Sequence, residues 1–232
     1  MANYISSAQS AQASAVSTLL KSLYLQMAAA LTVTGIVAYF LSASPLFWQM
    51  LTENSSIIWI AIIAQLGLVV WITARIRSLS MTTATILFIL YSVLMGVTMS
   101  SIFMVYTMSS IASTFFITAG TFLAMSILGY TTRMDLSRIG SILIMALIGI
   151  IIASVVNIFM HSETLYWIIS YAGVLIFVGL TAYDTQEIKG MLTQYGAADD
   201  MGHKYALLGA LTLYLDFVNL FLHLLRILGD RR

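Results

Sequence analysis

Seven apolar stretches, each long enough to cross a lipid bilayer as a helix, follow one another along nearly the whole chain. A bilayer-spanning helix needs about 20 consecutive apolar residues, and repeated stretches of that length are typical of transmembrane helices. Only 8% of the 232 residues are charged and 60% are hydrophobic, whereas soluble domains carry about 25% charged residues. Lipid must therefore cover the outer surface, and the sequence predicts an all-α membrane protein.

The predicted organisation is a polar N-terminal tail at 1–21, a single seven-helix transmembrane domain at 22–228 and a short C-terminal tail at 229–232. No cleavable signal peptide is expected in the tail, which lacks a charged region followed by a short apolar one. The loops are expected to be short except for the polar stretch from Lys189 to Lys204. The predicted spans cover residues 22–43, 56–75, 82–105, 109–131, 139–160, 164–187 and 205–228.

The basic residues of the loops predict the orientation in the membrane. Lys and Arg are absent from the loops after the first, third and fifth spans. They occur after the second, fourth and sixth spans, at Arg75, Arg77, Arg133, Arg138, Lys189 and Lys204. Basic loops stay on the cytoplasmic side, so the N-terminus is expected to be cytoplasmic. Seven spans then place the C-terminus outside, although Arg226, Arg231 and Arg232 lie there. The alternative is that the last segment is re-entrant or incomplete.

Composition also excludes several classes of function. The net charge is +1 and there is no basic run, so no nucleic-acid partner is expected. Cysteine is absent and the three histidines are scattered, which excludes thiolate sites and a typical zinc motif. The three lysines, Lys21, Lys189 and Lys204, lie at span ends or in loops, so none can form a retinal Schiff base. We expect no cofactor.

Two aspartates lie inside the last two predicted spans. Asp216 is in the middle of the seventh span, and Asp184 is in the cytoplasmic third of the sixth. An acidic side chain near the bilayer centre costs roughly 2.5–3.5 kcal/mol. Such a residue should face the interior of the helix bundle and find a partner there, so these aspartates are the candidate functional centre.

The polar residues of the seventh span share one helical face. They recur at intervals of 3, 4, 3, 4 and 3, at Gly209, Thr212, Asp216, Asn219, His223 and Arg226. Asn157 belongs to a shorter stripe on the fifth span. Thr212, Asn219, His223 and Asn157 are therefore candidates for lining a pathway. Small and polar residues on one face also serve helix packing, which is the simpler interpretation of most of them.

The aspartates can likewise be read in two ways. They could form a structural hydrogen-bonded clasp between the sixth and seventh spans. Alternatively, because two carboxyl groups in a low-dielectric site cannot easily both ionise, the pair could hold a proton or exchange it for a cation. Calcium prefers carboxylate oxygens, so Asp184 and Asp216 are also candidates for transient Ca²⁺ binding. Arg75 and Arg77 could supply a counter-charge, although both also fit ordinary positive-inside anchoring.

Three segments carry a family resemblance. Gly179-Leu-Thr-Ala-Tyr-Asp-Thr-Gln and Leu213-Tyr-Leu-Asp-Phe-Val-Asn-Leu-Phe-Leu-His-Leu-Leu-Arg226 closely resemble the last two spans of the Bax inhibitor-1 (TMBIM) family. Gly129-Tyr-Thr-Thr-Arg-Met-Asp-Leu-Ser137 resembles the family's loop after the fourth span. The resemblance covers nearly the whole chain after the tail, and it points to a bacterial inner-membrane member.

The resemblance implies a fold in which the last helix is central and surrounded by the other six. It also implies a pH-sensitive calcium leak channel, with Asp184 and Asp216 matching the family's di-aspartyl sensor position by position. Calcium would then be the transported ion and protons the regulator, with the bilayer and other membrane proteins as partners. The family's gating arginine in the second span does not carry over cleanly to Arg75 or Arg77, because the register depends on where a gap is placed.

Two other functions remain open. A non-conducting interaction protein, for example one that modulates a membrane protease or a stress response, is compatible with the sequence. An intramembrane aspartyl protease also uses two aspartates. However, Asp216 lies in Tyr-Leu-Asp-Phe within a continuous apolar helix rather than in a Gly-x-Gly-Asp turn. We therefore expect that the protein is not an enzyme.

Overall fold

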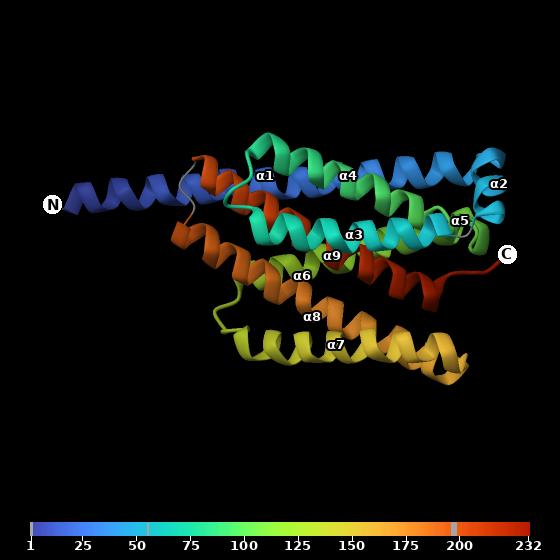
Figure 1. Cartoon of the computed structure of the whole chain (residues 1–232). Helices are drawn as coiled ribbons and strands as arrows, with labels where there is room; N and C mark the ends of the chain where they lie inside the picture. The colour runs from blue at the N-terminus through green and yellow to red at the C-terminus, as the bar shows by residue number, and fades with distance from the viewer. Residues whose placement is uncertain (1, 55, 196–198) are drawn as a thin grey trace. The chain divides into compact units, whose positions relative to one another are not determined.

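The computed structural model describes residues 2–54, 56–195 and 199–232, and these are almost entirely helical (Figure 1). Seven segments within these ranges are long and apolar enough to cross a membrane, which confirms the predicted all-α membrane class. The helices are α1 Ala2–Ser42, α2 Pro45–Glu53, α3 Ser56–Arg75, α4 Met81–Met99, α5 Ile102–Val105, α6 Met108–Thr131, α7 Ser137–Met160, α8 Glu163–Tyr195 and α9 Asp200–Leu228.

The second, fourth and fifth spans match their predicted bounds closely, whereas the third, predicted as one helix over 82–105, is interrupted between α4 and α5. The first loop contains a helix that was not predicted. In the structure Ser44 caps α2, because its hydroxyl accepts a hydrogen bond from the backbone N–H of Phe47 at 3.3 Å. Pro45 occupies the first turn, where its missing N–H and fixed φ are tolerated.

The prediction of a long polar loop from Lys189 to Lys204 is wrong, because α8 continues to Tyr195 and α9 begins at Asp200. Asp199 accepts a hydrogen bond from the backbone N–H of Gly202 at 2.8 Å, and Lys204 forms an ion pair with Asp200 at 2.6 Å. These polar contacts stabilise the first turn of α9 without any apolar pattern. The predicted N-terminal tail is likewise helical from Ala2 onward.

The chain forms two compact units. The first unit contains Met1–Val105 and Lys189–Leu211, and the second contains Tyr106–Ile188 and Thr212–Arg232. Because α8 and α9 each contribute to both units, neither unit is a continuous stretch of sequence. The single domain predicted at 22–228 therefore stays a prediction.

In the first unit, α4 packs against both α1 and α3. The buried hydroxyl of Thr34 donates a hydrogen bond to the carbonyl of Ser92 at 2.9 Å and ties α1 to α4. On the other side, the amide of Gln65 donates to the carbonyl of Leu94 at 3.0 Å and ties α3 to α4. Such interhelical polar contacts replace the hydrophobic driving force that lipid does not supply between helices.

The second unit is built from α6, α7, most of α8 and the second half of α9. Its core joins α8 to α9 through a cluster of buried apolar side chains, namely Ile176, Phe177, Leu180 and Leu220. Aromatic rings join α6 to α9, since Phe217 lies edge-on to Phe115 and Phe122 with ring centroids 5.4 and 5.5 Å away. These contacts hold α9 between two neighbours.

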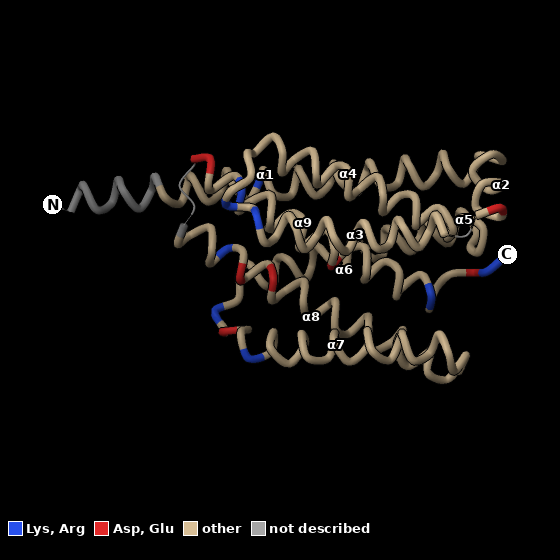
Figure 2. The backbone as a smooth tube through the Cα atoms, in the orientation of Figure 1, with Lys and Arg blue, Asp and Glu red and all other residues tan. Residues whose placement is uncertain are grey.

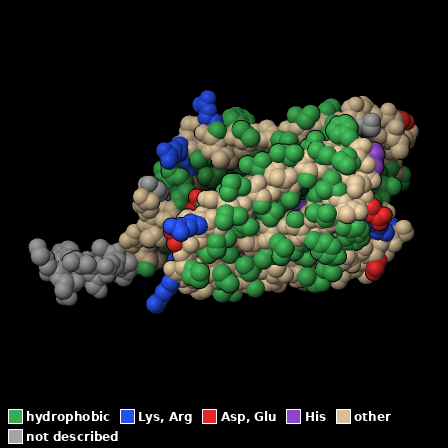
Figure 3. All heavy atoms as spheres, turned by 90° about the horizontal axis from the view of Figure 1, so that it is seen from below, with side chains coloured by type: hydrophobic (Ala, Val, Ile, Leu, Met, Phe, Trp, Pro, Cys, Tyr) green, Lys and Arg blue, Asp and Glu red, His purple; other side chains and the backbone are tan. Residues whose placement is uncertain are grey.

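The outer surface is strongly apolar, as expected for a protein whose solvent is lipid. Hydrophobic side chains cover much of the face shown in Figure 3, and Lys, Arg, Asp and Glu gather mainly toward helix ends within each unit (Figure 2). No part of the most apolar window of α7 is buried, whereas 61% of that of α9 is. This contrast agrees with an inner position for the last span, although its predicted place at the centre of six helices stays a prediction.

Candidate functional site

The two predicted aspartates lie together in the second unit. Asp216 is in the interior of α9 with only 4% of its surface exposed, and Asp184 is half-buried on α8. Their carboxyl groups interact directly and lie within hydrogen-bonding reach of each other. The tertiary structure thus brings together two acidic groups that are 32 residues apart in the sequence.

One carboxyl oxygen of Asp216 lacks a hydrogen-bond donor among the described residues. Asp216 Oδ2 is buried and, with both groups ionised, has no hydrogen-bond partner among the described residues. Two carboxylates are both acceptors and cannot hydrogen-bond to each other. A single proton on one of them supplies the missing donor, and removing that proton leaves two buried negative charges in contact. The geometry therefore fits a pair that shares a proton.

The polar neighbours of Asp184 on its own helix already have partners. The hydroxyl groups of Thr181 and Thr185 donate to backbone carbonyls one turn earlier, both at 2.7 Å. Thr185 also lies 3.4 Å from the hydroxyl of Ser126 on α6. These hydroxyl protons are directed away from Asp184, whose carboxyl group interacts with that of Asp216.

Glycines let α6 and α7 approach α8 next to Asp184. A Cβ atom at Gly129 of α6 would overlap the backbone carbonyl of Ala182, and one at Gly140 of α7 would overlap the ring of Tyr183. The residues immediately before Asp184 are therefore packed on two sides without intervening side chains. This close packing holds Asp184 in a fixed register against its neighbours.

Gln186 fastens the loop between α6 and α7 to the same turn of α8. Its Oε1 accepts a hydrogen bond from the backbone N–H of Leu136 at 2.9 Å, and its Nε2 donates to the carbonyl of Met134 at 2.8 Å. Because Gln186 lies two residues after Asp184, this clamp fixes the turn of α8 that follows Asp184. The sequence does not reveal this clamp, since both partners of Gln186 are backbone groups.

Replacing Gln186 with leucine is expected to raise deuterium uptake at Leu136 and to destabilise the protein by about 1–2 kcal/mol, since two hydrogen bonds are lost. Hydrogen–deuterium exchange of the purified protein measures the first effect, and thermal unfolding measures the second. Gln194→Leu, an exposed position near the end of the same helix, is the matched control. Unchanged exchange in the loop of the Gln186 variant would contradict the clamp.

His223, one of the candidate pathway residues, is buried on α9. Its ring stacks on Phe177 with centroids 5.7 Å apart, and it fills the space that Gly173 leaves by lacking a side chain. Its Nδ1 has no hydrogen-bond partner among the described residues. His223 is therefore a packed aromatic ring, and its role in a pathway stays a prediction.

The remaining candidates have local contacts. The amide of Asn219 donates to the carbonyl of Leu215 on its own helix at 2.8 Å. Asn157 accepts a hydrogen bond from the backbone N–H of Ser162 at 3.0 Å and closes the end of α7. Thr212 is half-buried at the start of the part of α9 that belongs to the second unit. These contacts match the packing interpretation, and none of them tests ion passage.

The predicted counter-charges lie in the other unit. Arg75 and Arg77 are at and just beyond the end of α3 in the first unit, and both side chains are exposed. The pairing of either arginine with Asp184 or Asp216 stays a prediction.

A hydroxyl-bearing face of α6 was missed by sequence reasoning. Its buried residues recur almost every four positions and are Ser110, Thr114, Thr118, Phe122, Ser126 and Gly129. The spacing could have revealed this face, but none of its residues is charged, and so it did not stand out. The face meets α8 through Ser126 and α9 through Phe122.

No described group of three or more His, Cys, Asp or Glu side chains could hold a metal ion. Calcium takes six to eight oxygen ligands, so the carboxyl groups of Asp184 and Asp216 would supply only part of its coordination, and transient Ca²⁺ binding there stays a prediction.

Comparison with known proteins gives a consistent picture. Residues 16–232 match a family described as "Inhibitor of apoptosis-promoting Bax1". The inner membrane protein YbhL of Escherichia coli is 52% identical over 216 residues, which cover 93% of this chain and 92% of that protein. An uncharacterized protein of Borreliella burgdorferi is 50% identical over 89% of both chains. Another, from Rickettsia prowazekii, is 43% identical over 90% of this chain and 88% of that protein.

Proposed function

The chain belongs to the Bax inhibitor-1 family of membrane proteins, and on that premise we propose that it forms a pH-sensitive leak pathway for cations, chiefly calcium. Asp184 and Asp216 act as the proton sensor of this pathway. The name of the Escherichia coli relative and the bacterial sources of the others support a bacterial inner membrane as its location. The observation that carries the proposal is the buried contact between the two carboxyl groups.

In the closed state the pair holds one proton, and the hydrogen bond between Asp184 and Asp216 joins α8 to α9. When the proton leaves, two negative charges face each other in a low-dielectric setting and repel strongly. The helices then separate, or a cation enters between the oxygens and offsets the charge. Both outcomes favour cation passage at higher pH.

The surroundings of Asp184 strengthen this dependence on the proton. Glu187, one turn further along α8, and Tyr183, the preceding residue, both interact electrostatically with Asp184. Glu187 is exposed and adds a second negative charge near the pair. A cation that approaches from this end would meet Glu187 before the aspartates.

The test is calcium flux into liposomes that contain the purified full-length protein, measured across pH. Wild-type flux is expected to rise with pH. Asp184→Asn combined with Asp216→Asn mimics the protonated pair permanently, because an amide donates without a proton from solution. This double variant is expected to show low flux that does not vary with pH.

Flux and pH dependence that both survive the double substitution would refute the sensor. Wild-type protein that conducts no cation at any pH would refute the leak itself. In that case the non-conducting alternative, a membrane interaction or stress-regulatory protein such as a modulator of a membrane protease, becomes the better proposal. Recovery of a stoichiometric membrane partner by pull-down would support it.

A further inference from the structure

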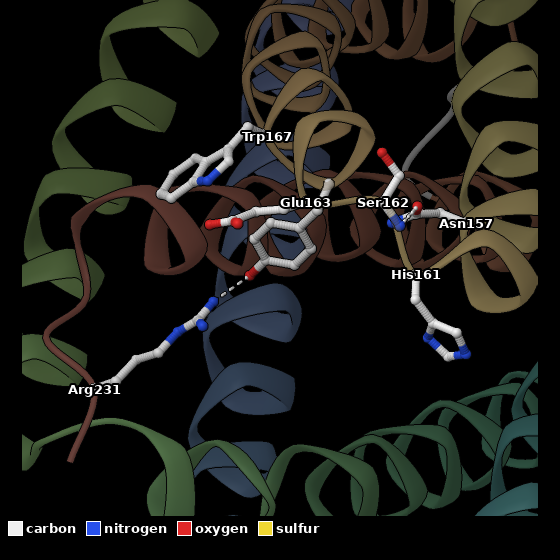
Figure 4. A pocket seen from close by; sticks show the side chains of 7 residues that line it. Asn157, His161, Ser162, Glu163, Trp167 and Arg231 are labelled. Carbon is white, nitrogen blue, oxygen red and sulfur yellow. Dashed lines mark hydrogen bonds between the residues drawn. The ribbon is translucent and has the colours of Figure 1, made fainter.

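Two adjoining cavities open where α7 ends and α8 begins, at the opposite end of α7 from Arg138. The first has a volume of about 350 Å³, and the second, of about 340 Å³, shares Asn157 and Tyr166 with it. The first includes Arg231 and the second includes Arg226 in its wall. The first cavity is lined mainly by Asn157, His161, Glu163, Tyr166, Trp167 and Arg231 (Figure 4).

Both arginines gather around one tyrosine. The guanidinium carbon of Arg226 lies 5.7 Å from the centroid of the Tyr166 ring, and that of Arg231 lies 5.6 Å from it. Arg231 also donates a hydrogen bond to the Tyr166 hydroxyl at 3.0 Å, drawn as the dashed line to Arg231 in Figure 4. These contacts hold two positive charges beside a half-buried aromatic ring.

Neither arginine has an acidic partner among the described residues. In the part of the chain that the structure describes, no carboxylate forms an ion pair with Arg226 or Arg231. The nearest acidic residue in sequence, Asp230, accepts from the hydroxyl of Ser110 at 3.3 Å instead. Arg226 is half-buried in the last turn of a membrane span, where an uncompensated charge is costly. Arg226 and Arg231 therefore lack a carboxylate that would neutralise their charge in the part of the chain that the structure describes.

The C-terminal segment is anchored so that Arg231 is held in place. The backbone N–H of Asp230 donates to Ser110 Oγ at 3.0 Å, and the N–H of Thr107 donates to the carbonyl of Asp230 at 3.1 Å. A short bridge between Tyr106 and Arg231 continues this attachment. Because the backbone is fixed to the start of α6, less conformational entropy is lost when Arg231 binds a ligand.

The surroundings of the two arginines are those of a lipid headgroup region. The cavities lie at the ends of two membrane spans, beside Tyr166 and Trp167, and aromatic residues of this kind are enriched where lipid headgroups meet hydrocarbon. Next to them, the last turn of α7 exposes apolar side chains, with Phe159 80% and Met160 63% exposed. This surface suits acyl chains, while arginine forks suit the oxygens of a phosphate group.

Glu163 places a negative charge in the wall of the first cavity. Its carboxylate faces the same cavity as Arg231 without forming an ion pair with it (Figure 4). A purely anionic headgroup would be repelled by this charge, whereas a headgroup with an amine would gain a partner. We propose that these cavities bind the headgroup of an aminophospholipid, with its phosphate at Arg226 and Arg231 and its ammonium group at Glu163.

Native mass spectrometry of the delipidated full-length protein tests the proposal, with equal amounts of phosphatidylethanolamine and phosphatidylglycerol added. The wild type is expected to retain the amine lipid preferentially. Arg226→Gln with Arg231→Gln should weaken its binding by about tenfold or more, as expected for lost charge-assisted hydrogen bonds. Glu163→Gln should reverse the preference for phosphatidylethanolamine, so that this variant retains more phosphatidylglycerol.

Arg231→Gln alone, at an exposed position, guards against misfolding of the double variant, with thermal unfolding as the check. Arg138→Gln, in the first turn of α7 at the other end of that helix, is the matched control and should bind lipid like the wild type. Lipid retention that is unchanged in both the single and double arginine variants, or a wild-type preference for phosphatidylglycerol, would overturn the proposal. Displacement of lipid by inorganic phosphate at equal concentration would instead identify a site for the free anion.

Discussion

Replacing Gly129 with alanine is expected to lower the free energy of unfolding by about 1–3 kcal/mol, the usual cost of an extra methyl group in a packed interior. The new Cβ atom would overlap the carbonyl oxygen of Ala182, which belongs to the backbone and cannot rotate away. α6 and α8 would have to separate, and the contact between Thr185 and Ser126 would be lost with them. Thermal unfolding in detergent, followed by circular dichroism, measures the change.

Gly120 on the same helix is the matched control. A Cβ atom there meets nothing within 4 Å, and alanine is a better helix former than glycine by about 1 kcal/mol. Gly120→Ala should therefore leave the stability unchanged or raise it slightly. Equal destabilisation by both substitutions would show that the contact between Gly129 and Ala182 is not the cause.

The second large effect concerns the acidic pair itself. A double-mutant cycle of Asp184→Ala and Asp216→Ala is expected to give a favourable coupling of about 0.5–2 kcal/mol at low pH, the range for hydrogen bonds between membrane helices. The coupling should vanish as the pH rises, because it exists only while the pair holds its proton. Unfolding free energies of the four proteins at two pH values measure it.

A permanent donor provides the control for this cycle. In Asp216→Asn the side-chain amide donates to Asp184 whether or not a proton is available. Its coupling with Asp184 should therefore persist at high pH. If the wild-type pair shows the same coupling at every pH, the two groups do not share a titrating proton, and the contact is a structural clasp alone.

Much of the fold could be predicted from the sequence because lipid imposes simple requirements. Length and apolarity alone located α3, α6 and α7 to within two residues. Length and apolarity did not predict the helical residues outside the apolar stretches, as between Lys189 and Lys204. There, helix ends depend on single polar contacts such as that of Asp199 with Gly202. Apolar patterns do not report such contacts.

The site was only partly predictable for a different reason. Periodicity identified an inward polar face on α9, and the family resemblance paired Asp184 with Asp216. Neither could show that Asp216 Oδ2 lacks a donor among the residues that the structure describes, because that depends on which atoms of distant helices meet. The clamp by Gln186 was equally hidden, since backbone partners leave no mark on the sequence.

The unequal burial of α7 and α9 has a consequence for how such proteins diverge. Gly140 is the one buried residue among those of α7. Most side chains of α7 therefore face lipid, which hardly distinguishes leucine from isoleucine or valine. Substitutions among these residues should accumulate there with little selection against them. In the second half of α9, where Leu213, Tyr214 and Leu220 are at most 1% exposed, each change must fit a filled space. Descendants of a common ancestor should therefore differ most along α7 and least along α9.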